Sequence, residues 1–296
     1  MTGALSGLAL AAILGLQDPT SPAPATQEPP TLLDDVVVEG KMIETLAREF
    51  VSAASAPPNY RGLARWNREV CLGVVGLRRQ VAEHIIDRVS DVARSLDVEL
   101  GQPGCAPNAV IVATSDGRGL AASLVAERRR AFRIGFSRSN RGSAALEVFR
   151  TSDAPVRWWH ISFPYCADTG ELAIRIFQGP TPCASSYNRS MRGQGVADYL
   201  SRVLIILDVP RLEGADLSDL SDYLAMLVLA QIDPEGDTSG LDTVLNVLNQ
   251  PGNAEGLTEW DRAYLEALYA ARPGRVNAPG QADALAERMT RPISGE

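Results

Sequence analysis

The stretch that decides the fold runs from residue 69 to residue 114. It begins with EVCLGVVGL (69–77) and ends with AVIVAT (109–114), two apolar runs typical of buried strands. Between them, residues 78–96 carry apolar side chains at the spacing of one helix face. These side chains are Val81, Ile85, Val89, Val92 and Leu96. A strand, a long helix and a strand in this order favour a parallel pair joined by a right-handed crossover.

The middle of the chain predicts a hairpin. Strands are expected at 156–163 (VRWWHISF) and 172–177 (LAIRIF), with a turn at Asp168-Thr169-Gly170, because Asp and Gly favour turns. Residues 203–207 are short and apolar. They fit either a strand or the end of a helix that starts near Gly195.

Three further segments have weaker patterns. Residues 36–39 (VVVE) form a short β-prone run, and residues 43–54 have helical spacing. Residues 120–132 are expected to be helical, whereas residues 133–150 mix arginines with small side chains and are expected to be irregular.

The last third of the domain predicts a buried helix followed by a closing helix. Residues 217–232 (LSDLSDYLAMLVLAQI) are apolar on nearly every face, as in a central helix, with Asp216 or Ser218 as its cap. Residues 241–248 give one or two helical turns. Thr258 then caps a helix that reaches residue 271, with Asp261 in the position that Glu usually takes in a capping box.

The predicted fold class is therefore α+β or α/β, with a mixed sheet, a long crossover helix, a buried central helix and a closing C-terminal helix. The expected organisation is a signal peptide at 1–25, a disordered linker at 26–35, a single globular domain at 36–271 and a loose tail at 272–296 with a short helix near 281–289.

The signal-peptide prediction depends on Ala4–Leu16, an uncharged apolar run of the length of a signal-peptide core, followed by Ala23-Pro24-Ala25 as a small-x-small cleavage pattern. No Lys or Arg precedes the run, so an apolar tail without export function is the alternative. No apolar run approaches the roughly 20 residues of a membrane span, which excludes a polytopic membrane protein. The expected location is periplasmic or secreted.

Four cysteines in an exported chain suggest two disulfides. Of the three connectivities, Cys71–Cys105 and Cys166–Cys183 are favoured. Free thiols are the alternative. A metal site is disfavoured because no Cys-x-x-Cys pair is present.

The net charge of −8 argues against general nucleic-acid binding. One segment differs, because residues 128–150 hold seven arginines and one glutamate. Guanidinium groups bind phosphate and carboxylate, so this segment is a candidate for binding an anionic envelope component or an acidic protein. The alternative is that these arginines are solvated and paired to acidic residues. The candidate residues are Arg128, Arg129, Arg130 and Arg133.

The order of the predicted elements resembles that of a zincin-type metalloprotease domain of the metzincin branch. The most specific piece is Leu257-Thr258-x-x-Asp261-x-x-x-Leu265-x-x-Leu268-Tyr269, which is similar to the closing helix of matrix metalloproteases and their bacterial relatives. The resemblance covers about residues 68–271. It implies a zincin-like layout related to exported bacterial proteins of unknown function.

The sequence departs from that family at the metal site. In zincins the buried helix carries His-Glu-x-x-His, which holds zinc and activates its water. Residues 217–232 contain neither His nor Glu. The resemblance therefore implies a scaffold without its metal, and no metal, cofactor or catalytic residue is predicted.

Other candidate sites have structural alternatives that are favoured. His160 is expected to be a packed structural histidine, and His84 a solvent-side residue of the long helix. The loop Ser115-Asp116-Gly117-Arg118-Gly119 could hold an anion at a helix N-terminus, but an ordinary tight loop is favoured. The acidic residues around the buried helix are attributed to capping and solvation. They are Asp219, Asp222, Asp233, Glu235 and Asp237.

The resulting hypothesis is an exported, non-catalytic, zincin-like domain with a binding or structural role in the cell envelope. The alternative is a metal-independent hydrolase with an active site of unrecognised residues, since a Ser-His-Asp arrangement is compatible with the composition.

Overall fold

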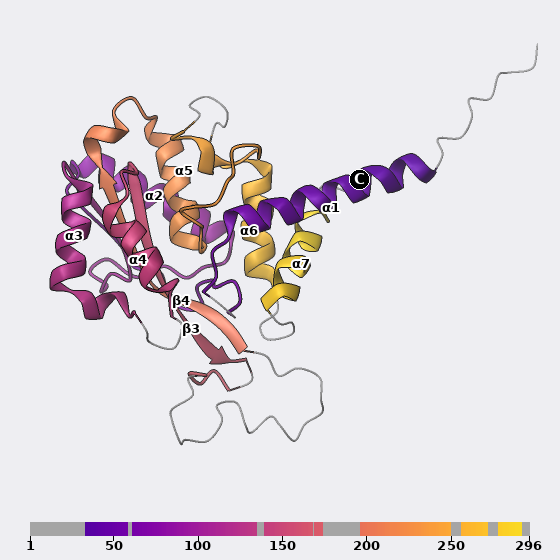
Figure 1. Ribbon diagram of the computed structural model, residues 1–296, viewed down its shortest axis with the longest axis horizontal. Coiled ribbons are helices and arrows are strands. Elements are labelled where there is room, and N and C mark those ends of the chain that lie inside the picture. The colour runs from indigo at the N-terminus through magenta and orange to yellow at the C-terminus, as the bar shows by residue number, and fades with distance from the viewer. Residues whose placement is uncertain are drawn as a thin grey trace, which may run out of the picture.

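The computed structural model describes residues 33–58, 61–134, 139–167, 169–173, 196–249, 256–271 and 278–291 (Figure 1). Its sheet has the strand order β1-β2-β4-β3. The strands are β1 (Leu72–Val75), β2 (Ala109–Thr114), β3 (Val156–Cys166) and β4 (Val196–Asp208). β1 and β4 run parallel to β2, and β3 is antiparallel to β4, so the predicted mixed sheet and the parallel pair β1–β2 are confirmed.

Helices cover both faces of the sheet. The crossover helix α2 (Arg79–Ser95) and helix α5 (Leu217–Leu229) lie on one face, and α3 (Gly117–Glu127) and α4 (Gly142–Thr151) lie on the other (Figure 1). The alternation of β4 explains both contacts, because Ile205 packs into the α2–α5 core and Ile206 into the α3–α4 core. The sheet is thus buried on both sides.

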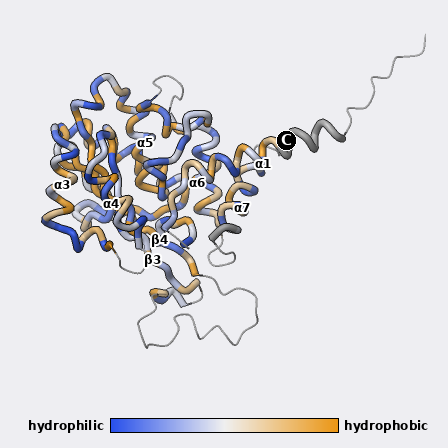
Figure 2. The backbone as a smooth tube through the Cα atoms, in the orientation of Figure 1, coloured by the Kyte–Doolittle hydropathy of each residue, from blue (hydrophilic) through white to orange (hydrophobic). Residues whose placement is uncertain are grey.

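Helix α5 is the central helix that its sequence predicts. Every residue from Leu220 to Leu229 is buried. The Asp216 carboxylate caps the helix by accepting hydrogen bonds from the amides of Ser218 (2.7 Å) and Asp219 (3.2 Å). Figure 2 shows apolar and polar residues alternating along α7 and along the coloured part of α1.

Three helices form a second group beside the sheet: α1 (Leu33–Ala54), α6 (Glu259–Ala270) and α7 (Ala278–Met289) (Figure 1). Phe50 of α1 packs against Tyr264 of α6, with ring centroids 5.6 Å apart. The predicted capping box is present, since Thr258 and Asp261 each accept a hydrogen bond from the other's amide. Among the helices of the described ranges, none combines the length and apolarity of a membrane span.

Two predictions near the chain ends are wrong. Residues 36–39 are not β-structure, and residues 33–35 are not linker, because both segments belong to α1. The local β-propensity of the valines yields to the amphipathic pattern of the following residues. The short helix predicted near 281–289 in the tail is confirmed as α7, which buries Leu285, Ala286 and Met289 against the body.

The prediction of irregular structure at 133–150 is also wrong, because residues 142–151 form α4. Asn140 accepts a hydrogen bond from the Gly142 amide at the start of this helix (3.0 Å), and Leu146 and Phe149 supply its buried face. The helix expected at 120–132 is α3 followed by a separate 3₁₀ turn, η1 (Arg129–Phe132).

Other boundaries shift. β3 extends to Cys166, and Tyr165 bridges Leu172, but residues 174–177 lie outside the described part of the chain. Residues 203–207 form a strand within β4 rather than a helix end. β1 is shorter than predicted and only partly buried, because it lies at a sheet edge. Within 241–248 the structure has one 3₁₀ turn, η4 (Val244–Asn246), and another, η3 (Val209–Leu212), follows β4.

Candidate functional site

A hollow lies along the outer edge of β3. It is a cavity of about 180 Å³, here called the edge groove. Its floor is Val156–His160 of β3. One wall is α4, through Ala145 and Val148, and the other is the segment 231–249 that follows α5. The groove therefore exists because β3 is the last strand of the sheet.

The floor of the edge groove offers main-chain hydrogen-bonding groups. Asp208 donates to the carbonyl of Pro155, so the odd-numbered residues of this part of β3 face β4. Val156, Trp158 and His160 therefore point their N–H and C=O groups outward. None of these six groups has a hydrogen-bond partner among the described residues, whereas the next outward amide, that of Ser162, donates to the Ser139 carbonyl (2.8 Å).

The side chains of β3 on the α5 face anchor the strand. The Trp158 indole donates to the Ile232 carbonyl (2.8 Å), and His160 Nε2 lies 2.7 Å from the Leu227 carbonyl. Because a carbonyl only accepts, His160 carries its proton on Nε2 and leaves Nδ1 as an acceptor. Tyr223 packs edge-to-face on Trp158 (6.2 Å, 82°) and lines the same cavity.

Burial sets the protonation of both titratable groups. Loss of hydration, together with the positive charge of Arg141, lowers the pKa of His160 to about 4. Burial raises the pKa of the Tyr223 hydroxyl. At neutral pH the groove therefore presents a neutral imidazole and a neutral phenol. His160 has the hydrogen bond expected of a structural histidine, and it also lines the groove.

An ion pair joins the two walls of the groove. Arg141, at the start of α4, contacts Asp233 (2.7 Å) and Glu235 (3.2 Å), which follow α5. A second hollow of about 330 Å³ lies alongside and shares Arg141, Asp233 and Ala145 with the first. The ion pair thus fixes the spacing of the walls.

The loop 115–119 is a tight helix-capping loop. Asp116 accepts a hydrogen bond from the Gly119 amide (2.7 Å), and Asp208 accepts one from the Gly117 amide (3.1 Å). A Cβ on Gly117 would lie 2.2 Å from Nη1 of the buried Arg157. The amides of Gly117 and Gly119 already donate to carboxylates of the chain, so the structure favours the tight loop over an anion site.

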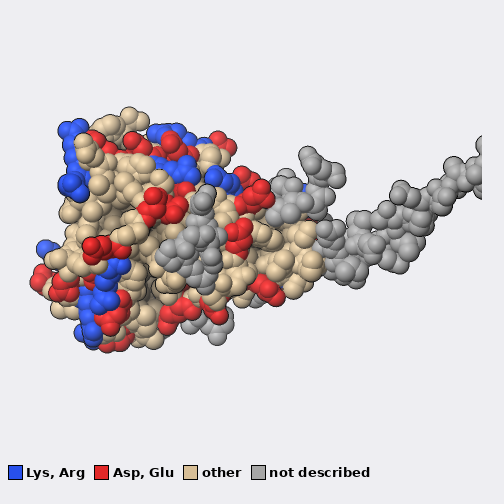
Figure 3. Space-filling model, turned by 90° about the horizontal axis from the view of Figure 1, so that it is seen from above, with Lys and Arg blue, Asp and Glu red and all other residues tan. Residues whose placement is uncertain are grey.

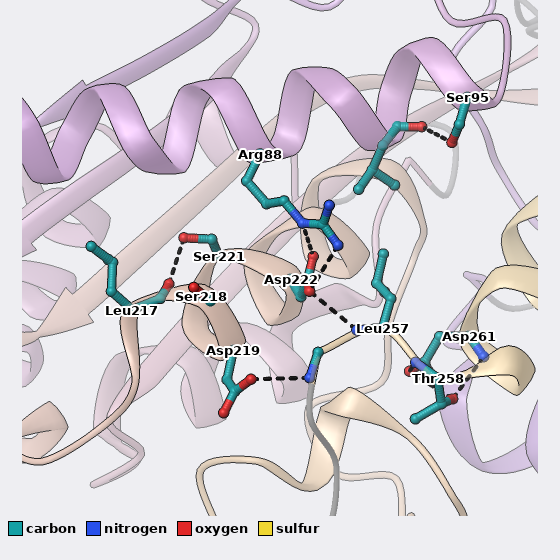
Figure 4. A network of polar contacts seen from close by, with 12 residues as sticks. Arg88, Ser95, Leu217, Ser218, Asp219, Ser221, Asp222, Leu257, Thr258 and Asp261 are labelled. Atoms are coloured by element: carbon teal, nitrogen blue, oxygen red, sulfur yellow. Dashed lines mark hydrogen bonds and ion pairs between the residues drawn. The ribbon is translucent and has the colours of Figure 1, made fainter.

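The acidic residues near α5 make structural contacts (Figure 4). Asp222 is ion-paired with Arg88 and accepts a hydrogen bond from the Leu257 amide (3.2 Å). Asp219 accepts one from the Gly256 amide (3.0 Å). These contacts fasten the start of α6 to α5. Asp219 and Asp222 thus tether the segment before α6 and do not cap a helix as predicted, whereas Asp233 and Glu235 pair with Arg141.

The arginines of residues 128–150 differ in whether they form ion pairs. Arg141 and Arg150 are ion-paired, the latter with Glu147 (2.5 Å). Arg138 lies outside the described residues. Arg128, Arg129 and Arg130 are exposed around η1, as is Arg133. On the face drawn in Figure 3, basic and acidic side chains mostly adjoin one another.

The predicted disulfide Cys71–Cys105 is confirmed. Cys166 is buried, but its expected partner Cys183 lies outside the described residues, as does the signal-peptide segment, so both predictions stay predictions. His84 is exposed on α2, as expected. In the described ranges no group of three or more His, Cys, Asp or Glu side chains is placed to hold a metal ion.

Comparison of the chain with protein-family models, with curated proteins and with solved structures found no match. The class that the fold defines is thus an α+β domain with a three-layer helix–sheet–helix core.

The packed strand predicted around Trp158, Trp159 and His160 lines the groove, but the sequence pattern does not indicate that this strand has a free edge. The hairpin predicted at 168–170 does not indicate a free edge, because its second strand would pair with the outer side of β3, where Leu172 bridges Tyr165. The wall formed by α4 was missed because its helix was not predicted.

Proposed function

We propose that this chain is a non-catalytic binding domain that holds an extended peptide segment in the edge groove by strand addition to β3. The observation that carries the proposal is the row of N–H and C=O groups on Val156, Trp158 and His160 that have no hydrogen-bond partner among the described residues. Strand addition satisfies such groups with the main chain of the ligand.

The size and walls of the groove support this ligand class. Val156–His160 spans about 13 Å of strand, enough for a short extended segment. Alternate ligand side chains would meet apolar surfaces on both walls, formed by Val148 on α4 and by Ile232 and Leu245 on the opposite segment. The two walls also shield the edge of β3 from non-specific pairing with strands of other chains.

The polar groups favour binding over hydrolysis. The one hydrogen bond of His160 among the described residues is to a carbonyl, so no hydroxyl nucleophile is paired with it there. The Ser162 hydroxyl instead accepts a hydrogen bond from Gln231 (3.2 Å). The metal-independent hydrolase therefore stays the second hypothesis.

The location in the cell envelope belongs to the same proposal. Cys71–Cys105 supports it, because such bridges persist in oxidising compartments. The zincin-like relationship rests on the order of α5 and the capped α6, and it stays part of the proposal.

The test uses the purified chain and short random-sequence peptides displayed on phage. We expect enriched peptides that share a motif and that slow hydrogen exchange at the amides of Trp158 and His160. Ala145→Trp fills the groove from α4 and should weaken binding at least about tenfold. Ser143→Trp, on an exposed position of the same helix, is the matched control and should bind normally.

Melting temperatures of both variants establish that they fold, and Ala145→Leu replaces Ala145→Trp if the larger side chain prevents folding. Equal binding by the groove variant and by the control, absence of any enriched peptide, or unchanged exchange at the β3 amides would each overturn the proposal.

A further inference from the structure

Three consecutive arginines at the end of α3 have no side-chain partner in the part of the chain that the structure describes. Arg128, Arg129 and Arg130 are exposed, and none makes an ion pair or a side-chain hydrogen bond within the described residues. Most other described arginines do so. Those with an ion pair are Arg48, Arg61, Arg79, Arg88, Arg94, Arg118, Arg141, Arg150, Arg211 and Arg291.

The backbone spreads these three side chains. Arg128 is the C-cap of α3, and Arg129 and Arg130 open the 3₁₀ turn η1. Successive residues of a 3₁₀ turn project about a third of a turn apart, so the side chains of Arg129 and Arg130 leave the backbone in different directions. They can each meet a different anion on an extended surface. The C-terminal end of α3 stabilises positive charge at this position.

The residues around Arg128, Arg129 and Arg130 indicate which kind of extended anionic surface they could bind. Phe132 and Phe149, the nearby described aromatic residues, are 3% and 4% exposed and pack on each other (5.6 Å). Within the described part of this region, no aromatic side chain is therefore presented for base stacking, which disfavours single-stranded nucleic acid. The whole chain carries −8, so an anionic surface repels most orientations of the molecule. An approach with η1 foremost brings the three exposed arginines to the surface first.

We propose that Arg128, Arg129 and Arg130 dock the protein on the phosphate groups of an anionic phospholipid surface. The contact is peripheral, because Ala131 is the only apolar side chain that η1 exposes. It is separate from the edge groove, since none of the three arginines lines that cavity. Binding depends on ionic strength and needs no peptide ligand.

The test is co-sedimentation of the full chain with vesicles of phosphatidylglycerol and phosphatidylcholine at low ionic strength. The triple variant Arg128→Gln, Arg129→Gln, Arg130→Gln should lower the partition coefficient on the order of 100-fold. The matched control is Arg78→Gln, Arg202→Gln, Arg262→Gln, which removes the same charge from three exposed arginines scattered over other elements. It should lower partitioning only slightly.

Equal losses in the two triple variants would show that net charge alone matters and would overturn the proposal. So would binding of the wild-type chain to pure phosphatidylcholine with the same affinity, or no binding to either vesicle. Competition by millimolar inorganic phosphate at constant ionic strength would indicate a single-anion site, which also contradicts it. Melting curves of both variants confirm that the changes leave the fold intact.

Discussion

Arg88 of α2 and Asp222 of α5 form a two-point ion pair, from Nε to Oδ1 (2.5 Å) and from Nη2 to Oδ2 (3.0 Å) (Figure 4). The same carboxylate accepts a hydrogen bond from the Leu257 amide, just before the start of α6. One side chain thus holds the crossover helix, the central helix and the closing segment together, although they are far apart in sequence.

Replacing Asp222 by Ala should destabilise the domain by about 3 kcal/mol, because it leaves a partly buried guanidinium and the Leu257 amide without their acceptor. Chemical denaturation monitored by tryptophan fluorescence measures the change. Arg79→Ala is the control, since its ion pair with Glu83 is exposed and should contribute less than about 0.5 kcal/mol. Similar losses in the two variants would contradict the structural role of Asp222.

Tyr264 should tolerate the loss of its hydroxyl. Its side chain is fully buried, and Oη has no hydrogen-bond partner among the described residues. Tyr264→Phe should leave the unfolding free energy unchanged or raise it by up to about 1 kcal/mol. Tyr269→Phe is the matched comparison, because its hydroxyl donates to the Leu229 carbonyl (2.9 Å), and it should lose about 1 kcal/mol. If Tyr264→Phe lost more unfolding free energy than Tyr269→Phe, the Tyr264 hydroxyl would have a hydrogen-bond partner.

His160 should make stability depend on pH between about 4 and 6.5. The folded pKa of about 4 lies below the ordinary value, so as pH falls through this window the unfolded chain binds a proton that the folded chain does not. This residue therefore lowers stability toward acid, by at most about 3 kcal/mol. His160→Gln keeps a donor for the Leu227 carbonyl and should remove that dependence.

The measurement is the difference in unfolding free energy between wild type and His160→Gln at several pH values. Burial raises the pKa values of Asp198 and Asp261, so their protonation stabilises the folded chain as pH falls, opposite to the effect of His160. Because both variants share these two carboxyl groups, their contribution cancels in the difference. A difference that stays constant from pH 7 to pH 4 would be inconsistent with a neutral His160.

Removing Cys71–Cys105 should destabilise the domain by about 3–4 kcal/mol, because the bridge restricts a long loop of the unfolded chain. The double variant Cys71→Ser, Cys105→Ser tests this in denaturant, with tryptophan fluorescence as the signal. If the variant and the wild type unfold at the same denaturant concentration, the bridge contributes no stability.

Local pattern was enough to predict the elements that are strongly periodic or strongly apolar. The stripe from Val81 to Leu96 predicted α2, the apolar run around Leu224 predicted α5, and Thr258 with Asp261 predicted the start of α6. Where the pattern was weak, packing decided. α4 forms because Leu146 and Phe149 meet Trp159 on the sheet, and α7 forms because it packs on α1 and α6.

The sequence by itself determined the α+β class, the buried central helix and one disulfide, because apolar periodicity, capping and cysteine spacing are local signals. Tertiary structure alone decided that β3 is the edge strand and that α4 and residues 231–249 wall its free side. It also decided that Arg141 contacts two carboxylates, while Arg128, Arg129 and Arg130 contact none among the described residues. These outcomes depend on which distant segments meet, and neither hydrogen-bond satisfaction along an edge nor charge pairing across a groove is encoded within a short window of residues.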